Sequence, residues 1–169
     1  KLQSYTDEGS PGRDWNVATG MVIEGKAGFQ IMGDWAKGEF TAAGKVPGVD
    51  YYCAATPSNN GYLYNVDSFI FYKSSDPDKQ AGQKLLAKLM MGKNFQKVFN
   101  LYKGSIPARL DVSMDEFDQC AKKSNADIKT AGAGGGLVPS FAHGMAQGNT
   151  MKAALQDVIT EHFNSDMSS

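Results

Sequence analysis

Five polar or aromatic residues in this sequence are of types that together could bind a neutral polyol such as a sugar. They are Trp35, Asn65, Asp67, Lys103 and His143. Asn and Asp offer planar acceptors and donors, while Lys and His add donors for vicinal hydroxyl groups. An indole offers a flat apolar face for the C–H side of a sugar ring. A pocket built this way would reject epimers, because an unmatched hydroxyl leaves a buried partner unpaired.

Each of these five residues also has an ordinary structural explanation when it is considered alone. A lone Trp is commonly a core residue, and an Asp at the start of a strand is often a turn acceptor. An exposed Lys is usually solvated, and a His beside a Gly is more often a satisfied loop residue than a ligand. Composition and spacing do not bring the five side chains together, so both interpretations stay open at this point.

Apolar residues recur at helical spacing over much of the chain and place the five residues at the ends of regular elements. The pattern predicts helices at 15–22, 36–43, 77–90, 95–102 and about 149–163. Short apolar runs predict strands at 27–32, 51–55 and 62–72, the last of them buried on both faces. Because helices and strands alternate, the predicted fold class is α/β.

Turn and capping signals separate these elements. Asp76 followed by Pro77 predicts a capped helix start. The spacing of Ser113 and Glu116 matches a capping box that would open a further helix. Gly132–Gly136 predicts a flexible, hinge-like loop. This loop lacks the Lys-Ser/Thr of a phosphate loop and does not follow a strand, so it does not indicate a nucleotide site.

The composition excludes several classes of partner. The chain has 169 residues, with 17 basic and 18 acidic side chains and 41% hydrophobic residues. Near-neutral charge gives no electrostatic footprint for nucleic acid or for a membrane surface. No apolar run reaches the roughly 20 residues of a membrane helix. The length fits one ordinary domain with a substantial core.

Sequence patterns of catalytic and metal sites are missing. There is no nucleophile elbow, no zinc-protease motif and no calcium loop. The two histidines, His143 and His162, lie too far from the cysteines in sequence to form a zinc pattern. We therefore expect a protein that is not an enzyme, with no catalytic residues, no metal and no cofactor.

Two cysteines, Cys53 and Cys120, lie 67 positions apart. One interpretation is a pair of small buried apolar residues. The other is a structural disulfide formed in an oxidising compartment, which the chain-entropy model values at about 4 kcal/mol. The residues alone leave these two interpretations even.

Several motifs, in order along essentially the whole chain, resemble the extracellular solute-binding proteins of sugar ABC transporters. Glu24–Trp35 is similar to an element near the middle of that family, solute-binding protein family 1. Four segments are similar to its periplasmic glucose-binding subgroup: Asn65–Phe69, Phe99–Arg109, Met114–Ala121 and Gly136–Gly144.

The resemblance implies a role for each candidate residue. Trp35 would stack on the sugar ring, Asn65 and Asp67 would bind ring hydroxyls, and Lys103 and His143 would complete the polar clamp. The cysteines fall where the subgroup has cysteines, so the resemblance favours the disulfide. It also implies a type II periplasmic-binding-protein fold of two lobes, with hinge closure on the ligand, a periplasmic location and delivery to the membrane subunits of an ABC permease.

A complete family member has roughly twice this length, so we expect the chain to be a C-terminal fragment that lacks the N-terminal half of the protein and its signal peptide. By family topology, residues 1–61 and 107–169 would form two parts of the C-terminal lobe. Residues 62–106 would belong to the N-terminal lobe. With one face of the cleft absent, the fragment alone is expected to bind sugar weakly.

Two other functions are compatible with the same residues. A sensory module could present the sugar to a membrane receptor, which the sequence does not separate from transport. A carbohydrate-active enzyme could use Asp67, Lys103 and His143 as an acid–base group. Glycosidases normally need two carboxylates flanking the bond, and only Asp67 stands among the candidates, so this function is the least favoured.

Overall fold

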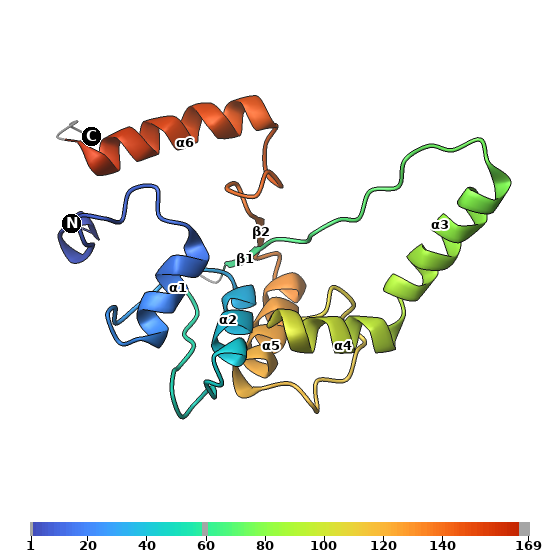
Figure 1. Ribbon diagram of the computed structural model, residues 1–169, viewed down its shortest axis with the longest axis horizontal. Coiled ribbons are helices and arrows are strands. Elements are labelled where there is room, and N and C mark those ends of the chain that lie inside the picture. Colours follow the sequence, from blue (N-terminus) through green and yellow to red (C-terminus); the bar gives the residue numbers. More distant parts are fainter. Residues whose placement is uncertain (1, 59–60, 166–169) are drawn as a thin grey trace.

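A computed structural model of the protein describes residues 2–58 and 61–165 (Figure 1). The elements follow one another as η1 (Leu2–Tyr5), α1 (Trp15–Ile23), η2 (Asp34–Ala36), α2 (Lys37–Ala42), β1 (Tyr62–Tyr64), α3 (Pro77–Met90), α4 (Lys93–Lys103), α5 (Gln119–Ala133), β2 (Leu137–Pro139) and α6 (Asn149–Asn164). The helices predicted from apolar spacing are confirmed, because that spacing depends only on residues within one or two turns.

Glycines stand at the C-terminal ends of several of these helices, and a capping side chain stands at the start of α3. Gly25 and Gly44 follow α1 and α2 with φ of 73° and 71°, and Gly104 caps α4 with φ of 87°. These left-handed angles are adopted readily by glycine. The predicted cap of α3 is confirmed, since the Asp76 carboxylate accepts from the N–H groups of residues 78 and 79, and Pro77 takes the first helical position.

The strand predictions were largely wrong. Only residues 62–64 of the expected strand 62–72 pair with a neighbour, and the rest runs extended without a partner. Residues 27–32 form no strand, and 51–55 contributes one isolated bridge between Tyr51 and Pro47. The side chain of Ile70, expected to be buried, is 80% exposed. A strand needs a second segment paired along its backbone, and among the described residues no strand pairs with positions 65–72, where Val66 N–H and the Tyr72 carbonyl bond only to side chains.

The start and end of α5 also differ from prediction. Ser113 and Glu116 do not form a capping box; the Ser113 hydroxyl instead accepts from the N–H of Asp115 in a local turn. The helix begins at Gln119, where the Asp118 carboxylate accepts from the N–H of Ala121 at 2.9 Å. At its far end α5 continues through residue 133, so the expected glycine loop is partly helical.

The two strands form a short parallel pair. Tyr62 lies opposite Leu137, and Tyr64 lies opposite Pro139. Parallel strands need a crossover, and here α3, α4 and α5 provide it. Helix α5 contacts both strands. The arrangement is a mixed helix and strand fold, as expected for an α/β protein.

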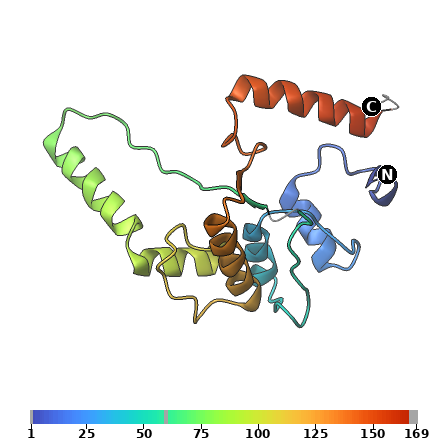
Figure 2. The same ribbon diagram turned by 180° about the vertical axis from the view of Figure 1, so that it is seen from behind.

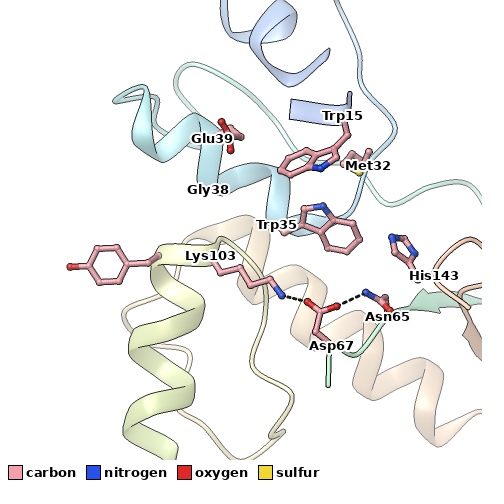
Figure 3. Close-up of a pocket in the computed structure, with 10 residues that line it drawn as sticks. Trp15, Met32, Trp35, Gly38, Glu39, Asn65, Asp67, Lys103 and His143 are labelled. Carbon is pink, nitrogen blue, oxygen red and sulfur yellow. Dashed lines mark hydrogen bonds and ion pairs between the residues drawn. The ribbon is translucent and has the colours of Figure 1, made fainter. Parts of the chain in front are cut away.

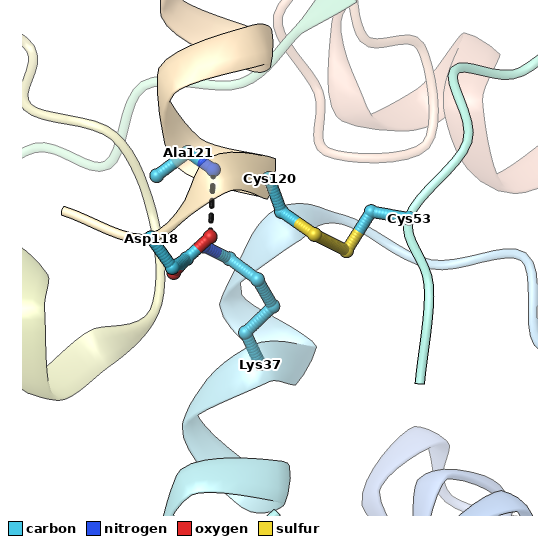
Figure 4. The surroundings of a disulfide bond; sticks show 5 residues. All are labelled: Lys37, Cys53, Asp118, Cys120 and Ala121. Atoms are coloured by element: carbon cyan, nitrogen blue, oxygen red, sulfur yellow. Dashed lines mark hydrogen bonds and ion pairs between the residues drawn. A yellow bond between two sulfur atoms is a disulfide. The ribbon is translucent and has the colours of Figure 1, made fainter. Parts of the chain in front are cut away.

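The core lies where α2, α4 and α5 meet. It buries the side chains of Phe40, Phe117 and Ala121. Beside it, the Cys53–Cys120 disulfide is present with the two Cα atoms 5.7 Å apart, which confirms the pairing that the resemblance favours (Figure 4). The disulfide ties the loop before β1 to the first turn of α5.

A partly buried ion pair lies next to this disulfide and connects α2 to α5. The ammonium of Lys37, whose side chain is only 7% exposed, contacts the Asp118 carboxylate at 2.6 Å (Figure 4). Burial raises the pKa of Asp118, but the hydrogen bonds from Lys37 and from the Ala121 N–H outweigh it. The pKa of this carboxyl therefore falls below its ordinary value.

Two parts of the molecule extend away from this core. The extended segment 65–76 leads to α3, and α6 lies on the opposite side of the two-stranded sheet from α4 (Figures 1 and 2). Both carry exposed apolar side chains, among them Phe69 (59%), Leu85 (70%) and Val158 (54%). Across residues 2–58 and 61–165, no helix is both long and apolar enough to span a membrane.

Candidate functional site

All five residues predicted from the sequence lie around one pocket of about 620 Å³ (Figure 3). The pocket lies among α1, η2, α2, the end of α4, the segment after β1 and the loop after β2. Its lining residues are Trp15, Met32, Trp35, Gly38, Glu39, Asn65, Asp67, Tyr102, Lys103 and His143. Segments separated by more than 100 positions in sequence therefore converge on a single concave surface.

Trp35 is held in the short 3-10 helix η2, which leads directly into α2. The ring folds back over Gly33, where a Cβ atom would lie only 2.2 Å from the indole. A glycine at this position is thus required by the space that the ring occupies. The indole is half-buried and presents a free face towards the pocket (Figure 3).

The start of α2 touches the end of α4 backbone to backbone. A Cβ on Gly38 would lie 2.8 Å from the carbonyl oxygen of Lys103, and a Cβ on Gly104 would lie 2.5 Å from the Gly38 nitrogen. Side chains at these two positions would force the helices apart. The close approach brings Lys103 to the same pocket as Trp35.

Asp67 is the centre of a small charged cluster in the pocket. The Lys103 ammonium pairs with its Oδ2 atom, and the Asn65 amide donates to its Oδ1 atom at 3.1 Å (Figure 3). The hydrogen bond from Lys103 is the main cause that lowers the pKa of Asp67, with Asn65 and the nearby His143 also contributing. The carboxylate is therefore kept ionised, as a hydrogen-bond acceptor.

His143 completes the polar side of the pocket. Its Nδ1 atom lies 2.7 Å from the hydroxyl of Ser140, which is itself buried and whose N–H donates to the Tyr64 carbonyl of β1. The imidazole meets the Trp35 indole edge to face, with ring centroids 5.2 Å apart and planes at 85°. The other ring nitrogen, Nε2, lies on the side of the imidazole away from Ser140.

Sequence reasoning missed half of the lining, above all a second indole and a second carboxylate. Trp15, at the start of α1, is 39% exposed and lies on the same side of the pocket as Trp35 (Figure 3). The helical pattern assigned Trp15 only to the apolar face of a helix. Glu39 on α2 also lines the pocket, so the expectation of a single acid at the site is wrong.

The sequence match that decides the family covers most of the chain. Residues 1–150 match the model of the bacterial extracellular solute-binding protein family. The chain belongs to this family.

Named relatives agree with this assignment. A probable sugar-binding periplasmic protein of Brucella suis is 49% identical over the whole of this chain. A protein of the same description from Rhizobium meliloti is 47% identical, again over the whole chain. An ABC transporter extracellular-binding protein of Pyrococcus horikoshii is 33% identical over 95% of it. The chain spans 40%, 41% and 35% of the length of these three relatives.

The chemistry available to this chain at the pocket is that of hydrogen bonding and stacking. Two indoles supply apolar faces, and Asn65, Asp67, Lys103 and His143 supply donors and acceptors. Within residues 2–58 and 61–165 there is no group of three or more His, Cys, Asp or Glu side chains placed to hold a metal ion.

Proposed function

We propose that this chain is part of a periplasmic receptor that binds a monosaccharide, with glucose as the first candidate, and delivers it to an ABC import permease. The observation that carries the proposal is the convergence of Trp35, Asn65, Asp67, Lys103 and His143 on one pocket. The names of the relatives, which describe sugar-binding periplasmic proteins, support the ligand class and the compartment.

Each side chain has a defined task in this proposal. The Trp35 indole stacks on the apolar face of the sugar, and Trp15 adds a second aromatic surface. Asp67, held ionised, accepts hydrogen bonds from adjacent hydroxyls, while Asn65 and Lys103 can each donate to them. His143, oriented by Ser140, offers its free ring nitrogen to a further hydroxyl.

We further propose that residues 62–106 belong to one lobe of a larger protein, and residues 1–61 and 107–169 to the other. Under this division Trp35 and His143 come from one lobe, and Asn65, Asp67 and Lys103 from the other. The sugar would then bridge the two lobes and favour their closure. The exposed apolar side chains of segment 65–76 and of α3 support the proposal that the N-terminal half of the protein covers them.

Binding is favoured over catalysis by the names of the relatives, which describe binding proteins, and the charge state of Asp67 argues against this residue as a catalytic acid. A glycosidase needs a protonated carboxylic acid to assist the leaving group, in addition to a carboxylate. The paired Lys103 lowers the pKa of Asp67, so Asp67 holds no proton to donate near neutral pH. Glucose recovered unchanged after long incubation would agree with this reading. Presentation of the sugar to a membrane sensor remains the second candidate function, because it uses the same pocket.

Calorimetric titration with glucose and its epimers tests the proposal. In the longer protein we expect saturable glucose binding that Asp67→Ala abolishes, with galactose or mannose bound more weakly. The present chain alone is expected to bind weakly, since it spans only 40% of the relatives' length. Micromolar binding by the chain alone would contradict the need for a second half. No binding of any hexose by the longer protein would overturn the function.

A further inference from the structure

Asp34 lies directly before Trp35 but does not itself line the pocket. Its Oδ2 atom accepts a hydrogen bond of 2.9 Å from the backbone N–H of Ile106, 72 positions later in the chain. Ile106 follows the end of α4, three residues after Lys103. The bond therefore joins the segment that carries the indole to the segment that carries the ammonium.

This bond occurs where the two segments already touch. Gly38 and Gly104 bring the α2 and α4 backbones so close that neither position has room for a Cβ. The glycines allow the approach but do not hold it, because they contribute no directional side-chain interaction there. The Asp34 carboxylate provides such a directional interaction, because it accepts a hydrogen bond from the Ile106 backbone N–H.

The electrostatic surroundings of Asp34 agree with a carboxylate that is partly removed from water and bound by a backbone donor. Burial raises the pKa of Asp34, while the Ile106 N–H and the charges of Lys37 and Lys103 oppose that shift. Burial is the main cause that raises the pKa of the Tyr62 hydroxyl, and the negative charge of Asp34 adds to it. Removing the carboxylate would leave the Ile106 N–H without this acceptor, and an unpaired, partly buried donor favours separation of the segments and entry of water.

We propose that Asp34 is a positioning residue that sets the distance between Trp35 and Lys103 across the pocket. The inference rests on the proposed function for its consequence, which is that a sugar ring can stack on the indole and reach the Lys103–Asp67 pair at the same time. Asp34 does this without touching the sugar.

The first experiment reads the position of Trp35 without any ligand. The chain has two tryptophans, so Trp15→Phe leaves Trp35 as the sole indole emitter. In this background Asp34→Ala should red-shift the emission and raise the acrylamide quenching constant. Asp34→Asn retains an oxygen acceptor for the Ile106 N–H and should restore the parent spectrum. The matched control is Asp76→Ala, which removes another carboxylate that accepts from backbone N–H groups, far from the pocket.

If Asp34→Ala does not fold, as judged by circular dichroism, Asp34→Glu tests whether Asp34 positions Trp35. Glu keeps the charge and the acceptor but adds one methylene, so the same hydrogen bond requires a shift of the segment that carries Trp35. A changed Trp35 spectrum in the folded Glu variant supports the inference. An unchanged spectrum in a folded Ala or Glu variant overturns it.

The second experiment measures glucose affinity in the longer protein with Trp15 intact. We expect Asp34→Ala to weaken binding by about tenfold or more, and Asp34→Asn to stay within about threefold of the parent. Parent-like binding by Asp34→Ala would overturn the inference. If the parent itself binds no hexose, the proposed function fails, while the fluorescence experiment still decides the role of Asp34.

Discussion

The region around the disulfide and the region formed by segment 65–76 with α3 differ in the contacts that stabilise them. Around Cys53–Cys120 the chain is held by a covalent link, a partly buried ion pair and a stacked Phe40–Tyr51 pair with ring centroids 4.1 Å apart. Segment 65–76 and α3 expose large apolar side chains, although Val66 and Asp67 at the start of the segment contact Met145 and Lys103. The first region is therefore stabilised by contacts within the described residues, and the exposed apolar side chains of the second agree with our proposal that the rest of the protein covers them.

Among the changes predicted here, loss of the disulfide should lower the free energy of unfolding the most. Replacing both Cys53 and Cys120 by Ser should lower the free energy of unfolding by about 4 kcal/mol, because the bond closes a long loop. Urea denaturation followed by circular dichroism measures this. The parent treated with a reductant should lose the same amount, and the double variant should not respond to reductant. A loss below about 1 kcal/mol would show that the other contacts hold the region without the bond.

Loss of the Lys37–Asp118 ion pair should have the second largest effect on the free energy of unfolding. Lys37→Met leaves the Asp118 carboxylate without its buried partner and should cost about 2 kcal/mol, since partial exposure of Asp118 lessens the penalty. The pKa of Asp118 is lowered in the fold, so its stabilising contribution is present above the ordinary value of 3.8 and is lost as pH falls towards the folded value.

Urea denaturation between pH 6 and pH 3 checks this linkage. The parent should lose stability in the acid part of that range, and Lys37→Met should lose less. Equal pH slopes in the two proteins would contradict the assigned role of the pair. Lys79→Met is a suitable control, because Lys79 is exposed and lies 3.9 Å from its partner carboxylate.

A third effect should be confined to α3. Asp76→Ala removes the cap of this helix and should cost about 1 kcal/mol, expressed as fraying of the first turn. Amide hydrogen exchange should speed up at residues 78–81 and stay unchanged in α2 and α5. Faster exchange in α5 would show that α3 and the disulfide region unfold together, and the contrast between them would then fail.

The same contrast explains what the sequence could predict. Helix positions and their glycine ends follow from neighbours along the chain, so Gly25, Gly44 and Gly104 were read correctly. Strand 62–72 depends on a partner strand that the described residues do not provide beyond position 64. The five candidate site residues were selected by their types, and the motif resemblance then gave each a role; helical and strand periodicity gave no reason to expect them at one pocket. Trp15 was missed because helical spacing explains an indole equally well as core.

The smallest effect is expected where α3 is most exposed. Leu85→Ala should change the free energy of unfolding of this chain by less than about 0.5 kcal/mol, because the side chain is 70% exposed and leaves no cavity. Met90→Ala, on the same helix but 8% exposed, is the matched control and should cost about 2 kcal/mol. If residues 62–106 belong to a lobe completed by the rest of the protein, Leu85→Ala should become costly in the longer protein, while the cost of Met90→Ala should stay nearly constant. Equal, small effects of Leu85→Ala in both forms would mean that α3 stays exposed and that the second lobe covers a different surface.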